Sequence, residues 1–193
     1  MNKGALLVRL ETKSASIEAL RSKGEAAKAD LKESKQRQKN QNIVSAFKAH
    51  FTFCPTYFFF DNYSQNVMKK DFKSVQFLDE NLEHDASIKF NGANFFTAEF
   101  GTLEQDTAQY FSGYYTVPTK NGPERRARYY GEPHMRFGAL IIKSDQFVQL
   151  KRPFKYYSRT LDSVPLAKLE STVVAKMDKK LHRFYKRMMR RNY

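Results

Sequence analysis

Two apolar segments constrain the fold of this chain most. Residues 51–60 and residues 137–143 are apolar at successive positions, so that both faces of an extended strand would be apolar. Strands that are buried on both faces read this way, because helices cover the two faces of the sheet. We therefore expect a mixed α/β (α+β) fold, a small mixed β-sheet packed by helices, with these two segments side by side. Pro55 cannot donate to a ladder, so it marks either a bulge or a strand start that leaves Thr56–Phe60 as the central piece.

The middle of the chain shows weaker strand, turn and helix patterns. Alternating or apolar residues predict further strands at Ser74–Leu78, Ile88–Phe90, Phe95–Phe100 and, after a turn, Gln146–Leu150. The turn Asn91-Gly92 favours a hairpin between the second and third of these strands. Short helices are expected at about 63–71 and 102–110, and the Pro- and Gly-rich residues 117–138 predict a loop or a hairpin excursion.

The N-terminal segment, residues 1–49, is predicted to be helical from residue 4 onward. It is rich in Ala, Glu, Lys, Leu, Gln and Arg, which are strong helix formers. Gly24 follows Lys23 as a glycine follows the end of a helix, and Glu25 would suit the start of a second helix. Two alternatives stay open here, a helical hairpin that turns at Gly24 and one long helix that tolerates the glycine.

The remaining residues, 50–193, are expected to form the α/β core of what is one globular domain overall. The core ends in a C-terminal amphipathic basic helix, whose apolar residues recur every three or four positions and predict one stripe facing the sheet. Ser163 and Pro165 suit the start of this helix. The stripe consists of Leu166, Leu169, Val173, Met177, Leu181, Phe184 and Met188.

The charge is unevenly distributed along the chain. The formal net charge is +14, with +6 in residues 1–50, −4 in residues 51–120, +2 in residues 121–150 and +10 in residues 151–193. Such asymmetry indicates an anionic partner, which could be a protein, a nucleic acid or a membrane surface. The alternative is that Lys and Arg only cover solvated helix faces.

Two segments are candidate sites for an anionic partner. A basic aromatic loop within residues 121–138 combines guanidinium groups, which bind phosphate, with rings that stack on unpaired bases. The end of the C-terminal helix could contact phosphates or lie on an anionic membrane. The alternatives are an exposed loop with ordinary charges and a helix that only packs on the sheet. The candidate residues are Arg125, Arg126, Arg128, Tyr129, Tyr130, Arg136, Lys179, Lys180, Arg183, Lys186, Arg187, Arg190 and Arg191.

Signals for catalysis or metal binding are weak. The histidines, at positions 50, 84, 134 and 182, are far apart, and no nucleotide-binding or nucleophile motif occurs, so no cofactor, metal or catalytic residue is predicted. Glu99, Glu104 and Asp106 form the densest carboxylate group, which could do acid–base work or belong to an ordinary surface loop. The single cysteine, Cys54, is expected to be a small buried hydrophobe. No apolar run is long enough to span a bilayer.

The chain resembles one group of proteins. A helical lead-in reaches residues 43–47, followed by the apolar segment 51–60, then residues 75–78 and residues 139–150. In this order the segments resemble uncharacterised exported proteins of Bacteroidota. The resemblance covers most of the chain and implies a location in the cell envelope or periplasm, with a signal peptide ahead of the helical segment. The chain departs from that pattern by lacking the signal, which keeps a cytoplasmic location as the alternative.

The leading functional hypothesis from the sequence is a non-catalytic envelope or scaffold protein that engages a partner through its terminal helices. The alternative is a nucleic-acid-binding accessory protein that uses residues 125–136 and 179–191. An enzyme is the third hypothesis, and it would require an enclosed pocket lined by Glu99, Glu104 or His134.

Overall fold

A six-stranded mixed sheet forms the centre of the protein. The structure is a computed structural model, and it describes residues 4–92, 94–130, 137–160 and 168–191. The strand order is β3-β2-β1-β4-β7-β8; β1 is parallel to both of its neighbours and the other pairs are antiparallel. The strands are β1 (Ala5–Leu10), β2 (Thr56–Phe60), β3 (Phe77–Leu78), β4 (Phe95–Thr102), β7 (Gly138–Lys143) and β8 (Tyr157–Arg159).

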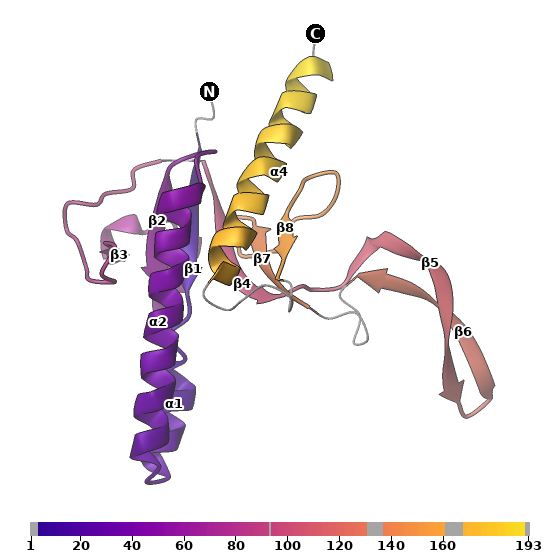
Figure 1. The fold of residues 1–193 in the computed structure, drawn as a ribbon, viewed down its shortest axis with the longest axis horizontal. Helices are drawn as coiled ribbons and strands as arrows, with labels where there is room; N and C mark the ends of the chain where they lie inside the picture. Colours follow the sequence, from indigo (N-terminus) through magenta and orange to yellow (C-terminus); the bar gives the residue numbers. More distant parts are fainter. Residues whose placement is uncertain (1–3, 93, 131–136, 161–167, 192–193) are drawn as a thin grey trace.

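Two long helices lie side by side on one face of this sheet (Figure 1). They are α2 (Ala26–His50) and α4 (Leu169–Arg191), and α2 follows the shorter α1 (Ser14–Ser22). The other face is covered by irregular segments that include α3 (Ser64–Met68) and the 3-10 turns η1 (Asp61–Tyr63) and η2 (Phe72–Ser74). The predicted fold class is confirmed, as are the helical hairpin at the N-terminal side and the amphipathic helix at the C-terminal side.

Alternate residues of the strands divide the core into two layers. On β1, Leu6, Val8 and Leu10 face the helices, where they join Phe47 of α2 and Met177 of α4. The opposite face of the sheet is dominated by aromatic residues. There the ring of Phe90 lies 5.1 Å from that of Tyr57, 4.9 Å from that of Phe72 and 5.7 Å from that of Phe95.

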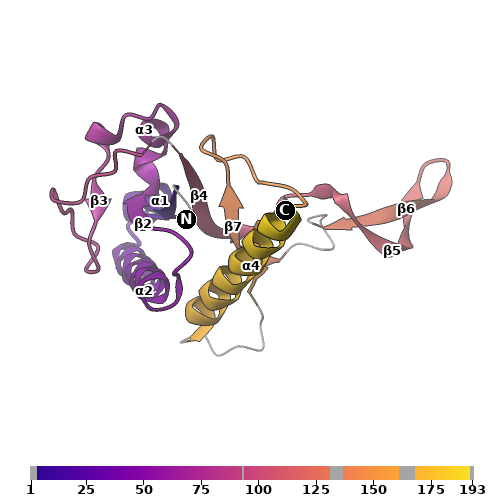
Figure 2. The ribbon, with the colours of Figure 1, turned by 90° about the horizontal axis from the view of Figure 1, so that it is seen from above.

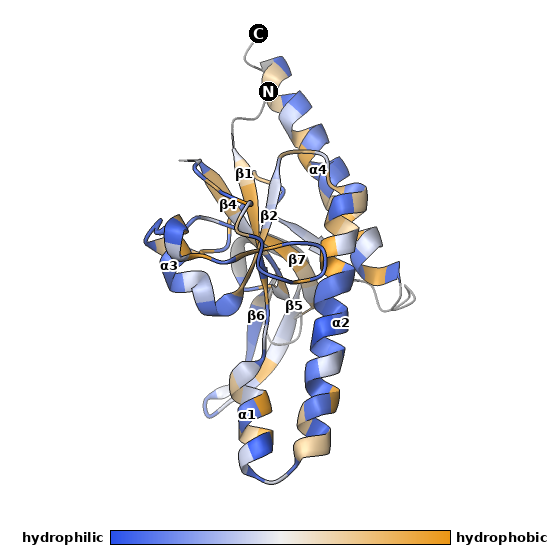
Figure 3. Ribbon diagram, turned by 90° about the vertical axis from the view of Figure 1, so that its left-hand side faces the viewer, coloured by the Kyte–Doolittle hydropathy of each residue, from blue (hydrophilic) through white to orange (hydrophobic). Residues whose placement is uncertain are grey.

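The turn at Gly24 decides between the two alternatives for the N-terminal helices. Gly24 has φ +76°, which an L-residue adopts only at a cost. Its N–H donates to the carbonyl of Arg21, and the N–H of Glu25 donates to the carbonyl of Leu20. This pair of bonds is the Schellman ending of a helix. The chain therefore forms a hairpin of α1 and α2 rather than one long helix, and Figure 3 shows that hairpin extending well beyond the sheet.

The prediction that residues 4–49 are helical throughout is wrong at its start. Ala5–Leu10 form β1, the strand that lies between β2 and β4. Ala and Leu favour helices in isolation, but β1 is buried on both faces, and that burial outweighs the propensity. Lys13, with φ 54°, then turns the chain into α1.

The polar middle of α2 has a specific packing role. Gln36 and Asn40 are buried, although residues 32–42 read as polar all round. The amide of Gln36 donates to the Oδ1 atom of Asn40 at 3.1 Å, and the Nδ2 atom of Asn40 donates to the carbonyl of Glu11 at 2.8 Å. These bonds satisfy buried polar groups and attach α2 to the end of β1.

Two predictions about strand neighbours are wrong. Residues 56–60 and 138–143 are strands, with Pro55 just before the first, but β1 and β4 lie between them. Residues 88–90 are not a strand, so the hairpin at Asn91-Gly92 does not form; β4 pairs with β1 instead, because the two apolar strands bury each other. Of residues 74–78 only Phe77–Leu78 pair, and residues 146–150 contribute a single bridge, from Gln149 to Lys143.

The helix expected at residues 102–110 is also wrong, because a long hairpin occupies this region. It consists of β5 (Asp106–Thr119) and β6 (Gly122–Tyr130), joined by Lys120 and Asn121. Of the two alternatives for residues 117–138, the hairpin is therefore the one that forms, and it begins earlier than expected. Figures 1 and 2 show it projecting from the body as a two-stranded arm, which we call the β-arm.

Candidate functional site

The outer half of α4, residues 179–190, extends beyond the body of the protein (Figure 1). The apolar stripe of the helix is buried in the core at Val173, Met177 and, at the start of the outer half, Leu181. The same stripe then continues to Met188, which is 40% exposed, beside Met189, which is 45% exposed. The periodicity of the stripe is confirmed over the described residues, but only the inner part of the stripe covers the sheet. The predicted positions Ser163, Pro165 and Leu166 lie outside the described residues.

The outer half of α4 itself contains no acidic residue. Asp178 is the last acidic residue of the chain. Within the described residues, no carboxylate lies at ion-pair distance from Lys179, Arg183, Lys186, Arg187 or Arg190, all of which are exposed. The structure thus presents five of the predicted α4 residues together on one exposed segment, and Arg191 belongs to the last turn by its backbone.

Lys180 differs from the other predicted α4 residues. Its Nζ atom donates to the carbonyl of Tyr157 at 2.9 Å and lies 5.3 Å from the centre of the Tyr157 ring. Burial lowers the pKa of this lysine, and the charges of Lys155 and Lys176 add to the effect. Lys180 therefore fastens α4 to β8 rather than standing in solvent.

Asp178 ties the start of this outer half to the segment that precedes β2. Its Oδ1 atom accepts hydrogen bonds from the backbone N–H groups of Thr52 at 2.7 Å and Phe53 at 3.1 Å. The ring of His182 lies beside this contact, with Nε2 3.1 Å from the hydroxyl oxygen of Thr52. A buried carboxylate with two such donors holds residues 51–54 firmly against α4.

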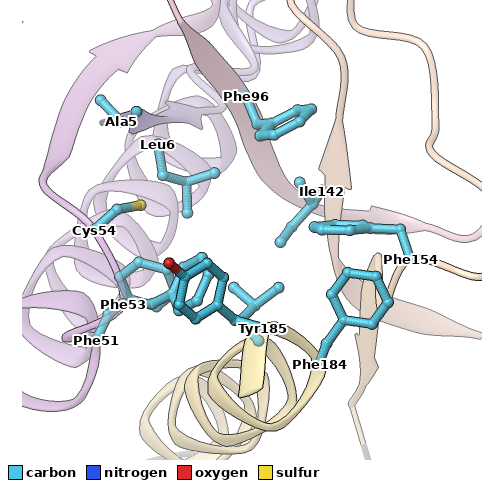
Figure 4. Close-up of a pocket in the computed structure, with 12 residues that line it drawn as sticks. Ala5, Leu6, Phe51, Phe53, Cys54, Phe96, Ile142, Phe154, Phe184 and Tyr185 are labelled. Carbon is cyan, nitrogen blue, oxygen red and sulfur yellow. The ribbon is translucent and has the colours of Figure 1, made fainter. Parts of the chain in front are cut away.

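An apolar pocket lies under the outer half of α4, at the end of the sheet where β1 begins (Figure 4). Its volume is about 270 Å³. The Phe154 ring, which lies 5.4 Å from that of Phe184 and 5.8 Å from that of Phe96, forms part of the wall. The remaining wall comes from β1, β7, α4 and residues 51–54, among them Leu6, Ile142, Tyr185 and Cys54.

Cys54 lies on this wall, and its sulfur atom points towards the pocket in Figure 4. It is half-buried rather than fully buried. Burial raises the pKa of the thiol to about 11, and the negative charge of Asp178 contributes in the same direction. At neutral pH the side chain is therefore a neutral thiol, which behaves as a small hydrophobe, as the sequence predicted.

The β-arm carries the predicted residues of the basic aromatic segment. Arg125, Arg126 and Arg128 are exposed on β6, which corrects the expectation of a loop at these positions. The guanidinium of Arg125 lies 5.2 Å from the centre of the Tyr114 ring, and an Nη atom of Arg126 lies 2.9 Å from Glu124. Tyr129 is half-buried and Tyr130 ends the strand by its backbone, whereas Arg136 lies outside the described residues.

The two predicted anionic-partner segments do not form one surface. The β-arm and the outer half of α4 leave the body in different directions (Figures 1 and 2). A single partner that contacts both would have to span the body between them, so the two segments are separate candidate interfaces.

Two members of the carboxylate group singled out in the sequence, Glu99 and Glu104, are part of an ion-pair network, and the side chain of Asp106 lies outside the described ones. The Nζ atom of Lys143 lies 2.9 Å from Glu99 and 3.2 Å from Glu104. The Nε atom of Arg9 lies 3.0 Å from the same Glu99 carboxylate, as a charge contact without the alignment of a hydrogen bond. Two cations thus hold these carboxylates on β4 and just after it. Glu99 and Glu104 do not line the pocket under α4, and His134 lies outside the described residues.

The sequence did not predict the pocket. Its walls come from segments far apart in the chain, and no spacing rule connects them. The one available signal was the continuation of the α4 stripe through Phe184 to Met188, which is longer than a sheet of ordinary strand length can cover.

Comparison of the chain with known protein families, with curated proteins and with solved structures gave no match. None of the described helices combines the length and the apolar character required to cross a membrane. Among the residues that the structure describes, no three His, Cys, Asp or Glu side chains come together as metal ligands.

The raised pKa of Cys54 predicts slow alkylation with an unusual pH profile. With the pKa moved from an ordinary value of 9.0 to about 11, the thiolate fraction below pH 9 falls about 100-fold, since each pKa unit is a factor of ten. In native protein the iodoacetamide rate, followed by mass spectrometry, should still rise between about pH 9 and 10. Asp178→Asn should move the inflection to lower pH. A native rate that levels off near the ordinary thiol pKa would contradict the assignment, and the urea-unfolded protein is the control.

Proposed function

We propose that this chain is a non-catalytic interaction protein of the cell envelope, which engages an anionic partner through the outer half of α4. One observation carries the proposal: this half leaves the body with two exposed methionines and with exposed cations that have no carboxylate at ion-pair distance among the described residues. A surface that serves only solubility carries charges of both signs and few exposed apolar side chains. Methionines, by contrast, are adaptable contact residues at binding surfaces.

The pairing of charges elsewhere supports this assignment. The acidic middle of the chain neutralises cations of the N-terminal part, with no equivalent contacts at α4 among the described residues. The excess positive charge is thereby concentrated on the C-terminal helix, where it would attract an anionic partner over a Debye length. The neutralising contacts are Arg9–Glu99 at 3.0 Å, Arg37–Glu83 at 3.2 Å and Lys48–Glu80 at 2.9 Å.

The envelope location rests on the resemblance to exported proteins of Bacteroidota. An anionic lipid surface is available in an envelope, and basic amphipathic helices bind such surfaces. The location is tested by fractionating cells that make the natural full-length product. If the protein is recovered only with the cytosol, the envelope location is wrong, and the interaction with an anionic partner is then tested separately.

A second candidate function, binding of single-stranded nucleic acid, is favoured by the β-arm. It presents three exposed arginines on a two-stranded ribbon, and Arg125 lies over the ring of Tyr114, which is itself exposed. Aromatic rings that stack on bases, next to guanidinium groups that contact phosphates, are the elements of single-strand recognition. The arm and α4 are separate, so the two candidates make independent predictions.

For the leading candidate, removing cations from α4 should weaken binding to an anionic surface. A cation near such a surface contributes about 1 kcal/mol, so Arg187→Gln with Arg190→Gln should lower the affinity for phosphatidylserine-containing vesicles roughly thirtyfold. Vesicle co-sedimentation at several salt concentrations measures this.

The matched control removes two cations from the α1–α2 hairpin, with Lys23→Gln and Lys35→Gln, both of which are exposed in the native protein. It should change the affinity little. Equal losses in the two double variants would mean that net charge alone attracts the protein, and this would overturn the assignment to α4.

For the second candidate, the arm should bind oligonucleotides with a characteristic salt dependence. Each phosphate contact contributes about −0.7 to the slope of log affinity against log salt on a single strand. Arg125→Gln with Arg128→Gln should therefore lower the magnitude of that slope by about 1.4 in fluorescence anisotropy with single-stranded RNA. A slope that is unchanged by the arm variant but lowered by the α4 variant would remove the arm from consideration.

A further inference from the structure

We propose that the pocket under α4 takes the hydrocarbon chain of a single-chain anionic amphiphile, such as a long-chain carboxylate. This inference deepens the proposed function, and rests on it, because it names the anionic partner of the same end of α4. The argument follows from the composition of the walls, the volume of the pocket and the charge of the segments around it.

The walls exclude most polar ligands. Phe51, Phe53, Phe96, Phe154 and Phe184 line the pocket together with aliphatic side chains of β1, β7 and α4. Cys54 also contributes a neutral group, because burial raises the pKa of its thiol to about 11. A ligand with several polar groups would lose its hydration here without gaining hydrogen bonds, whereas a hydrocarbon gains by leaving water.

The volume suits a chain rather than a ring system with several substituents. A methylene group is close in size to a water molecule, which takes about 30 Å³ in the liquid. The pocket volume of about 270 Å³ therefore accommodates roughly nine such groups. One chain fills this space, and the two chains of a phospholipid do not fit.

The surrounding segments are positive. Residues 1–10, 49–60, 151–160 and 179–193, which contain most of the pocket wall, have no acidic residue. Asp178 directly precedes the last of these segments; it is 9% exposed, and its carboxylate accepts hydrogen bonds from the backbone N–H groups of residues 52 and 53. The segments that supply most of the wall thus carry net positive charge, which favours an anionic head group at the mouth of the pocket.

Basic residues lie close in sequence to two rings of the wall, those of Phe154 and Phe184, whose centres are 5.4 Å apart. Exposed basic residues lie within three positions of Phe154 and of Phe184, on either side of the contact between the rings. Both a loop and a helix that contribute to the wall therefore carry exposed basic residues close in sequence to these rings. They are Lys151, Arg152 and Lys155 near the first ring, and Arg183, Lys186 and Arg187 near the second.

The decisive experiment is a chain-length series. Straight-chain carboxylates of about six to sixteen carbons are titrated into the full chain by calorimetry, below their micelle concentrations. Each added methylene should tighten Kd about fourfold until roughly nine are buried, after which Kd should level off. A Kd that does not depend on chain length overturns the proposal.

Two variants should move the break point, which is the chain length at which Kd levels off, in opposite directions. Cys54→Leu adds carbon atoms to the wall and should shift the levelling to a shorter chain. Phe184→Ala removes a ring and should shift it to a longer one. The control is Val148→Ala, which trims an apolar side chain that is 62% exposed and distant from the pocket wall. A break point that stays the same in both pocket variants overturns the assignment to this pocket.

The head group is tested at constant chain length. The matching fatty alcohol should bind at least about tenfold more weakly than the carboxylate and without salt dependence, because it lacks the charge. The double variant Arg152→Gln, Arg187→Gln should lower the affinity for the carboxylate and leave the affinity for the alcohol unchanged. Equal binding of alcohol and carboxylate would contradict the anionic assignment.

Other occupants would give different results. If a second copy of the chain fills the pocket, light scattering will detect a dimer that Cys54→Leu disrupts, and the amphiphile is then ruled out. If the carboxylates bind only as part of a membrane, vesicle binding will occur without any response to the chain-length series. The pocket variants keep the cations of α4. If the full chain binds vesicles but shows no chain-length effect, this inference is wrong and the proposed function still stands.

Discussion

The burial of β1 between two parallel neighbours is the constraint on which the rest of the structure depends. A parallel connection from β1 to β2 requires the chain to return to the same end of the sheet, and a crossover helix provides this return. The α1–α2 hairpin is that crossover. It brings α2 across the sheet towards the start of β1, where the helix ends at His50 and residues 51–55 enter β2.

The pocket is a consequence of this arrangement. Because α2 ends where β1 begins, α4 alone among the described helices continues past that end of the sheet. Residues 51–54 close one side, where the carboxylate of Asp178 accepts two backbone hydrogen bonds. A charge-assisted pair of this kind contributes more than neutral hydrogen bonds do, and the donors would otherwise lose water without a partner. Burial raises the pKa of the Cys54 thiol on this wall, and the negative charge of Asp178 adds to the effect.

The sequence predicted those elements whose residues carry local signals. The stripe from Leu169 to Met188 defined α4, Pro55 marked the start of β2, and the Lys23-Gly24 pair allowed the turn that forms. The sequence did not predict β1, because a strand that is buried on both faces shows no alternation of apolar and polar residues. The Ala and Leu residues of β1 favour a helix equally well. The β-arm was predicted only in part: a hairpin was one of the two alternatives for residues 117–138, but a helix was expected at residues 102–110, where β5 begins. The pocket could not be predicted, since its position depends on which segments meet in space.

The arrangement of charge on α4 has an energetic cost that the fold itself does not offset. Lys179 and Arg183, Arg183 and Arg187, and Lys186 and Arg190 are pairs of like charge spaced four apart, each destabilising a helix by about 0.2–0.5 kcal/mol. The helix dipole favours cations only in the last turn, and residues 179–187 lie before it. In the N-terminal half of the protein, comparable cations are paired with Glu80, Glu83 and Glu99. An anion held at this end of α4, as proposed above, would supply the missing counter-charge and relieve this repulsion.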